Sequence, residues 1–96
     1  MVELRDGRRG FRLAGEIDLA TIDVLATALS VYAAPDDDLH VDLGQLRFID
    51  VTATRMLVDA ARRLDPPARV VLHDPPRVLR RILDLVWSQD RTITIA

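Results

Sequence analysis

The spacing of the apolar residues changes repeatedly along the chain, and this constrains the fold more than any other feature. Apolar and polar residues alternate over 2–5 and 11–13, which predicts a β-hairpin with its turn at Asp6-Gly7. Three segments with a helical period follow, and strand-like segments separate them. The predicted order is β-β-α-β-α-β-α-β, and strands that alternate with helices pair as parallel neighbours in a sheet. The pattern therefore predicts one α/β domain over residues 1–96.

The three helical segments are expected to pack on the sheet through their apolar faces. Their apolar positions are Ile22, Leu25, Leu29 and Tyr32; Ala53, Met56, Leu57, Ala60, Ala61 and Leu64; and Val78, Leu79, Ile82, Leu83 and Val86. Asp18 or Thr21 is expected to cap the first helix, and Asp74, which precedes two prolines, the third. Pro35 and Pro66-Pro67 end the first two helices.

Three later segments are predicted to be strands. Residues 39–43 alternate between apolar and polar side chains. Residues 70–72 form a short continuous apolar run, which is typical of a strand covered on both faces. Residues 92–95 alternate again and are expected to form the closing edge strand.

The composition excludes several classes of function. A net charge of −2 argues against a nucleic-acid-binding domain, which usually carries a basic excess. The chain contains no cysteine, which fits a reducing compartment. No apolar run approaches the roughly 20 residues of a membrane span, and the first residues lack the pattern of a signal peptide. We therefore expect a cytoplasmic protein without membrane insertion or direct nucleic-acid binding.

Few residues are candidates for catalysis. The two histidines, His40 and His73, have no serine or cysteine partner at a recognisable spacing. Neither belongs to a cluster of three or four metal ligands, and the chain has no glycine-rich phosphate loop. We therefore expect no enzymatic activity, no cofactor and no bound metal.

The segment Phe48-Ile49-Asp50-Val51-Thr52-Ala53 is the strongest candidate for a functional site. In it, a strand end runs into an acid and a hydroxyl residue at the start of a helix. Free backbone N–H groups and the helix dipole favour anions at such a place. Thr52 either caps the helix, which is worth about 1 kcal/mol, or accepts a phosphate while Asp50 provides the cap. The residues alone leave both roles open.

Several motifs, in the same order over nearly the whole chain, resemble the STAS domain family, named for sulfate transporters and anti-sigma factor antagonists. Gly15-Glu16-Ile17-Asp18 resembles the first family signature, which precedes the first helix. Val41-Asp42-Leu43 and Phe48-Ile49-Asp50 resemble the central strand and the lead-in to the second signature. Pro75-Pro76-Arg77-Val78-Leu79 is similar to the entry into the third helix.

The resemblance implies a mixed sheet with helices mainly on one face and, for the bacterial antagonists, a phosphorylation switch. Carried onto this chain, the phosphate acceptor is Thr52 and the flanking acids are Asp18 and Asp50. The implied partner is an anti-sigma factor that is also a serine/threonine protein kinase, and phosphorylation breaks the complex. The residues expected to bind the partner are Asp18, Asp50, Val51, Thr52, Ala53 and Arg55.

Three positions depart from the family pattern. Val51 replaces the usual first hydroxyl residue, Ala53 a glycine and Arg55 a small residue. Arg55 lies three residues after Thr52, close enough to meet a phosphate there; alternatively, it pairs with Asp59 at i+4 or simply faces water. Val51 and Ala53 also suit an accessory subunit that binds without phosphorylation, as some members of the family bind the ATPase of a lipid transporter. The sequence does not predict the oligomeric state.

Overall fold

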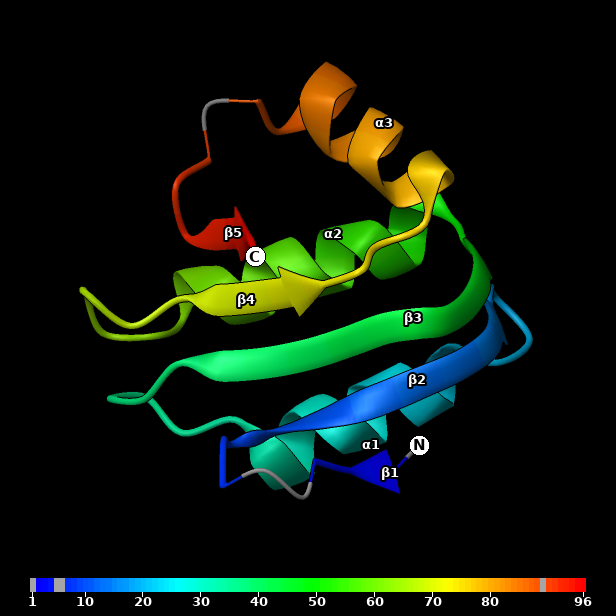
Figure 1. Ribbon diagram of the computed structural model, residues 1–96. Helices are drawn as coiled ribbons and strands as arrows, with labels where there is room; N and C mark the ends of the chain where they lie inside the picture. Colours follow the sequence, from blue (N-terminus) through cyan, green and yellow to red (C-terminus); the bar gives the residue numbers. More distant parts are fainter. Residues whose placement is uncertain (1, 5–6, 89) are drawn as a thin grey trace.

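The computed structural model describes residues 2–4, 7–88 and 90–96, and within them the chain forms one five-stranded sheet (Figure 1). The strands are β1 (Val2–Glu3), β2 (Gly10–Ile17), β3 (Leu39–Ile49), β4 (Val70–His73) and β5 (Ile93–Ile95). The helices are α1 (Ile22–Tyr32), α2 (Val51–Arg62) and α3 (Arg77–Val86). This order confirms the predicted β-β-α-β-α-β-α-β pattern. Of the turn predicted at Asp6-Gly7, Asp6 lies outside the described residues.

The strands follow one another across the sheet in chain order. β1 runs antiparallel to β2, whereas β2, β3, β4 and β5 are parallel neighbours. A helix makes each parallel connection, because the chain must return to the opposite end of the sheet before the next strand begins. The sheet is therefore mixed, and the carboxyl ends of β2 and β3 meet at one edge, where Ile17 pairs with Ile49.

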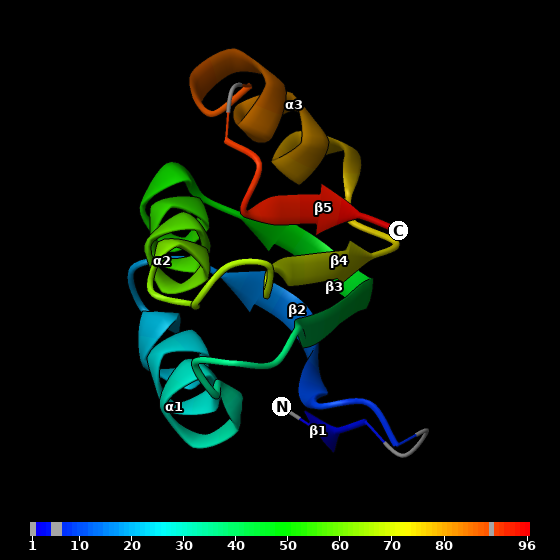
Figure 2. The same ribbon diagram turned by 90° about the vertical axis from the view of Figure 1, so that its left-hand side faces the viewer.

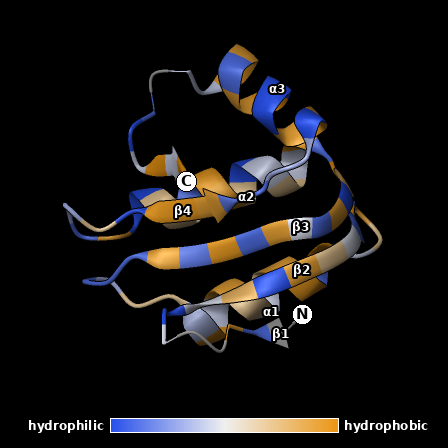
Figure 3. Cartoon of the chain, viewed as in Figure 1, coloured by the Kyte–Doolittle hydropathy of each residue, from blue (hydrophilic) through white to orange (hydrophobic). Residues whose placement is uncertain are grey.

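The helices α1 and α2 lie side by side on one face of the sheet, and α3 lies next to α2, toward the β5 end of the sheet (Figure 2). Residues of β3 alternate in hydropathy along the strand (Figure 3), and the apolar ones, such as Val41 and Leu43, are buried in the core. Phe11 of β2 stacks at a tilt on Tyr32 of α1, with 5.7 Å between the ring centroids. Apolar packing between α1, α2, the buried side of α3 and this face of the sheet thus forms the core.

The opposite face of the sheet, which Figure 1 views directly, is not covered by a helix within the part of the chain that the structure describes. Val70 and Leu72 of β4 are buried, but Val71 and His73 are only half-buried. The prediction that this strand is covered on both faces is therefore wrong. A continuous apolar run does not distinguish full cover from the partial burial that neighbouring strands alone provide.

The start of α3 also differs from the prediction. Pro76, not Asp74, occupies the N-cap position, and no side chain caps the helix. A proline disfavours the helical conformation in the residue before it, so the Pro75-Pro76 pair delays the helix start. Asp74 consequently lies two residues too early, in a turn with a φ of 53°.

Candidate functional site

The candidate site lies at the edge of the sheet where β2 and β3 end. Asp18 follows β2 and Asp50 follows β3. The backbone N–H of Asp50 donates to the carbonyl of Ile17 across the two strands, at 3.1 Å. Parallel pairing therefore brings the two acids that the sequence places 32 positions apart to one edge of the sheet.

Asp50, and not Thr52, caps α2. The Asp50 carboxylate oxygen Oδ1 accepts a hydrogen bond from the backbone N–H of Ala53 at 2.8 Å. Within the described residues the hydroxyl of Thr52 makes no hydrogen bond, and the side chain is exposed at the second residue of the helix. Of the two roles that the sequence left open for Thr52, the structure thus removes that of a cap and leaves its hydroxyl free.

The next threonine has the opposite environment. Thr54 is fully buried, and its hydroxyl donates to the carbonyl of Asp50 at 2.8 Å. Sequence reasoning missed this contact, although the spacing of Thr54 from the buried Leu57, Val58 and Ala61 places it on the inner face of the helix. Two hydroxyl residues two positions apart therefore face solvent and core, and only the first is accessible.

The other residues predicted for the site divide into structural and exposed positions. The carboxylate of Asp18 accepts from the backbone N–H of Ala20 at 2.9 Å and from the hydroxyl of Thr21 at 3.2 Å, which holds the loop after β2. Ala53 is fully buried and belongs to the core, so its side chain contributes only by holding the helix start in place. Val51, in contrast, is 54% exposed.

Two exposed apolar side chains that the sequence analysis did not single out belong to the same edge. Leu19 follows Ile17 by two residues, as Val51 follows Ile49, and those two isoleucines pair across the strands. Leu19 is 78% exposed, and Phe48, near the end of β3, is 40% exposed. We call Leu19, Phe48 and Val51 the apolar rim. An apolar residue directly after a turn-forming acid, as in Asp18-Leu19, was the available signal.

A groove of about 690 Å³ between α1 and α2 extends from this site. Small and apolar residues dominate it, and the residues that line it include Ala26, Leu29 and Ser30 from α1 and Thr52, Arg55 and Met56 from α2. Arg55 Nε lies 3.9 Å from Asp59 Oδ2, and both side chains are largely exposed. The structure thus shows the i+4 pair, but an exposed pair at this distance is weak. Arg55 is therefore available to a ligand in the groove.

The uncovered face of the sheet carries a second group of polar residues. His40 Nδ1 lies 2.9 Å from His73 Nε2, and Arg12 donates to Asp42 at 3.0 Å. The backbone N–H of Gly44 and then Arg12 lower the pKa of Asp42, against the opposing effect of partial burial. In the described ranges, no group of three or more histidine, cysteine or acidic side chains is placed to hold a metal ion.

These observations define a small α/β domain with a mixed sheet, whose exposed site lies at the start of its second helix. The chain belongs to the STAS domain family, because the family model described as "Mlab, STAS domain" matches residues 1–87.

Among solved structures, the chain is similar to the anti-sigma factor antagonist SpoIIAA in its unphosphorylated form, with a TM-score of 0.68 and 19% sequence identity. The match covers 100% of this chain and 88% of that one, and at this identity it shows a shared fold. A comparison with curated protein sequences finds no match. Within the described residues, the helices are too short or too polar to cross a membrane.

Proposed function

We propose that this domain is an anti-sigma factor antagonist that binds an anti-sigma factor kinase and loses that partner when Thr52 is phosphorylated. The observation that carries the proposal is the free, exposed hydroxyl of Thr52 at the start of α2. The fold shared with SpoIIAA and the membership of the STAS family support it.

Phosphorylation at Thr52 requires no change in the fold. The partner kinase supplies Mg-ATP; the Thr52 oxygen attacks the γ-phosphorus and loses its proton, and ADP leaves. Within the described residues the Thr52 hydroxyl has no hydrogen bond to break, because Asp50 already provides the cap of α2. The phosphate adds a charge of about −1.5 to −2, which the amino end of a helix tolerates. The consequence of the modification therefore falls on the surface outside the helix.

The same surroundings explain why a phosphate would release the partner. The apolar rim favours a dry contact with another protein, and an ionised phosphate resists the loss of water that such a contact requires. Asp18 and Asp50 add like charge at the same edge of the sheet. We therefore expect the unmodified domain to bind through the rim and the groove, with Asp18, Asp50, Val51 and Arg55 around the contact and Ala53 beneath it.

The first test is to incubate the purified protein with candidate anti-sigma kinases and Mg-ATP, and to record intact and peptide masses. We expect one added phosphate on Thr52 and none in Thr52→Ala. Thr27→Ala is the matched control, because Thr27 is an exposed threonine of α1 whose modification has no part in the proposal. A folded protein that no kinase phosphorylates, or a phosphate elsewhere, contradicts the proposed switch.

A binding measurement tests the consequence of the charge. Thr52→Glu should weaken binding to the kinase at least tenfold, whereas Thr27→Glu adds the same charge away from the site and should leave it within twofold. Equal binding by both variants contradicts a switch at Thr52. Because a carboxylate mimics a phosphate imperfectly, the enzymatically phosphorylated protein is measured alongside them.

The groove between α1 and α2 favours a second candidate, an accessory subunit that binds a transporter ATPase without phosphorylation. Its small and apolar lining, and the presence of Val51 where the family usually has a hydroxyl residue, suit a contact that needs no phosphate. Co-purification with a transporter ATPase, with unchanged binding by Thr52→Ala, would select this candidate over the kinase partner.

A further inference from the structure

The helix α3 has an unusual distribution of charge. Arg77, Arg80 and Arg81 all lie in its first half and are exposed. The first turn contains no acidic residue, and no side chain caps the helix. Arg77 therefore places a cation at the positive end of the helix dipole, with Arg80 and Arg81 in the next turn, and a cation at that end is the reverse of the stabilising arrangement. Local helix energetics do not explain why these residues stand there.

The rest of the structure does not neutralise these charges. Within the described residues the side chains of these three arginines make no hydrogen bond and no ion pair. The acid of the same helix, Asp84, is exposed and forms no ion pair with them either. The helix is instead held by its opposite side, where Leu79 and Leu83 are buried. The basic side is thus available to a ligand.

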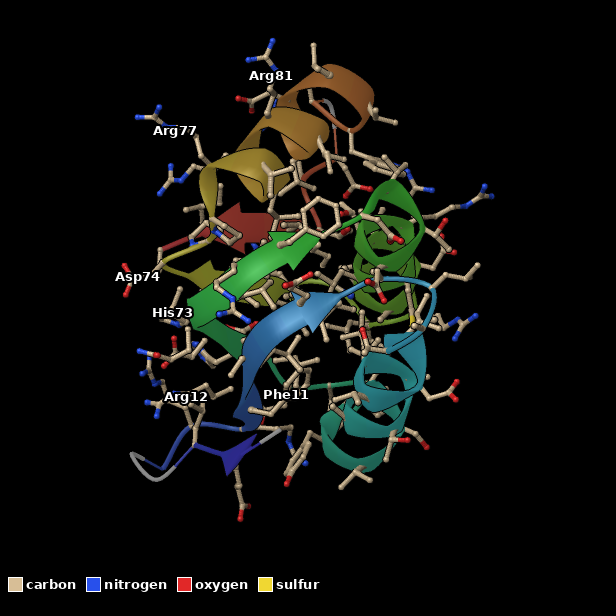
Figure 4. All side chains as sticks on the ribbon, turned by 90° about the vertical axis from the view of Figure 1, so that its right-hand side faces the viewer. Phe11, Arg12, His73, Asp74, Arg77 and Arg81 are labelled. Atoms are coloured by element: carbon tan, nitrogen blue, oxygen red, sulfur yellow. The ribbon has the colours of Figure 1, made fainter. Side chains whose placement is uncertain are left out.

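An apolar residue extends the basic side. Arg77, Arg81 and Leu85 are spaced four residues apart, so they form one ridge along the helix. Leu85 is 74% exposed, and its neighbour Val86 is 58% exposed. Figure 4 shows Arg77 extending from α3 into solvent on the side of the molecule from which Arg12 also projects, and Arg81 extending from the top of the helix, both away from α1 and α2. We call Arg77, Arg81 and Leu85 the basic ridge.

We propose that the basic ridge docks an acidic segment of a partner protein that carries an apolar residue beside its carboxylates. Two exposed guanidinium groups one turn apart suit two carboxylates at the same spacing, since arginine forms strong charge-assisted hydrogen bonds with them. Leu85 supplies an apolar end that a phosphate backbone or a lipid headgroup does not match. The site lies on a different helix from Thr52, so it does not depend on the proposed phosphorylation.

The net charge favours a short acidic segment over an extended polyanion. The chain as a whole carries a charge of −2, so a long nucleic acid or an anionic membrane also meets acidic surface. A short segment on α3 senses mainly the local arginines, because charges beyond about 8 Å are screened at physiological salt.

Fluorescence anisotropy with a labelled helical peptide tests the proposal. The probe carries two glutamates four residues apart and a leucine one turn beyond them, and a second probe has glutamines in place of the glutamates. The wild-type protein should bind the glutamate probe at least tenfold more tightly than the glutamine probe. Arg77→Gln/Arg81→Gln should lose at least tenfold in affinity, and Leu85→Ser should lose at least threefold. The control Arg69→Gln/Arg91→Gln removes the same charge at two exposed positions outside α3 and should stay within twofold.

The stability of the variants separates binding from folding. Because Arg77 opposes the helix dipole and the side chain of Arg81 is exposed, Arg77→Gln/Arg81→Gln should keep or raise the melting temperature while binding falls. A charge swap, Arg77→Glu/Arg81→Glu with a lysine probe, should restore binding. Equal affinity of the ridge and control variants overturns the proposal. The proposal is also overturned if the glutamate probe does not bind. This holds even if anionic vesicles or duplex DNA bind through the same arginines.

Discussion

The starts of α2 and α3 differ in how they satisfy the positive end of the helix dipole. At α2, the carboxylate of Asp50 accepts the backbone N–H of Ala53 and places negative charge at the helix start. At α3, Pro76 provides no side-chain cap, and Arg77 places positive charge in the first turn. The start of α2 is satisfied locally, and within the described residues the Thr52 hydroxyl makes no hydrogen bond. The start of α3 has no side-chain cap, and that helix is held by the burial of Leu79 and Leu83.

Removal of the cap of α2 should have the largest effect on stability. Asp50→Ala should lower the free energy of unfolding by about 1–2 kcal/mol, because it removes both the cap hydrogen bond and the favourable charge. Urea denaturation followed by circular dichroism measures the change. Asp59→Ala removes a carboxylate from an exposed pair on the same helix and should cost less than about 0.5 kcal/mol. Equal costs would show that Asp50 does not hold the helix start.

The two threonines of α2 should differ in how much their hydroxyl groups contribute to stability. Thr54→Val should lower the free energy of unfolding by about 1 kcal/mol, because it removes a buried hydrogen bond to the Asp50 carbonyl while keeping the side-chain shape. Thr52→Val should change it by less than about 0.5 kcal/mol, since that hydroxyl is exposed and unbonded. The same denaturation experiment compares them. A larger cost at Thr52 would mean that its hydroxyl does cap the helix.

At the start of α3, a substitution is expected to raise the free energy of unfolding, and not to lower it. Arg77→Glu should raise the free energy of unfolding by about 0.3–1 kcal/mol at low salt, because it replaces an unfavourable charge at the helix start with a favourable one. The gain should shrink as sodium chloride is added. Arg91→Glu, in the loop before β5, makes the same charge change away from a helix start and should show no such gain. A loss of stability at Arg77 would indicate that the arginine supports the fold.

On the uncovered face of the sheet, the contribution of Asp42 to stability should depend on pH. The pKa of Asp42 is lowered below its usual value of 3.8, chiefly by the backbone N–H of Gly44 and, after the opposing effect of burial, by Arg12. A lowered folded pKa means that Asp42 contributes stability above pH 3.8, which is lost as the pH falls through the lower folded value. Asp42→Asn should therefore cost less than about 1 kcal/mol near neutral pH, and the difference from wild type should vanish in strong acid. A difference that persists there would exclude ionisation as its cause.

Much of the fold could be predicted from the sequence. Periodic segments were predicted correctly, whereas a continuous apolar run and a pair of prolines misled the prediction. The periodicity predicted all three helices and their order among the strands. It failed for β4, since Val70-Val71-Leu72 has no period that distinguishes one covered face from two. It also misplaced the cap of α3, because the effect of two consecutive prolines on the helix start depends on backbone geometry.

For the candidate site, the sequence predicted the position and the structure decided the accessibility. Asp18, Asp50 and Thr52 could be selected from their order around the predicted strands and helix. Leu19 and Phe48 could not, since an isolated apolar residue does not show whether it will be buried. Their exposure depends on where β2 and β3 end relative to one another.

The sequence by itself determined the order of the elements and the faces that they bury, because periods of 2 and 3.6 residues are local properties of strands and helices. Only the tertiary structure decided which hydroxyl of α2 is exposed, which loops share an edge, and that the arginine side chains of α3 have no partner within the part of the chain that the structure describes. Those outcomes depend on hydrogen bonds and burial between segments that are distant in the chain, such as the pairing of Ile17 with Ile49.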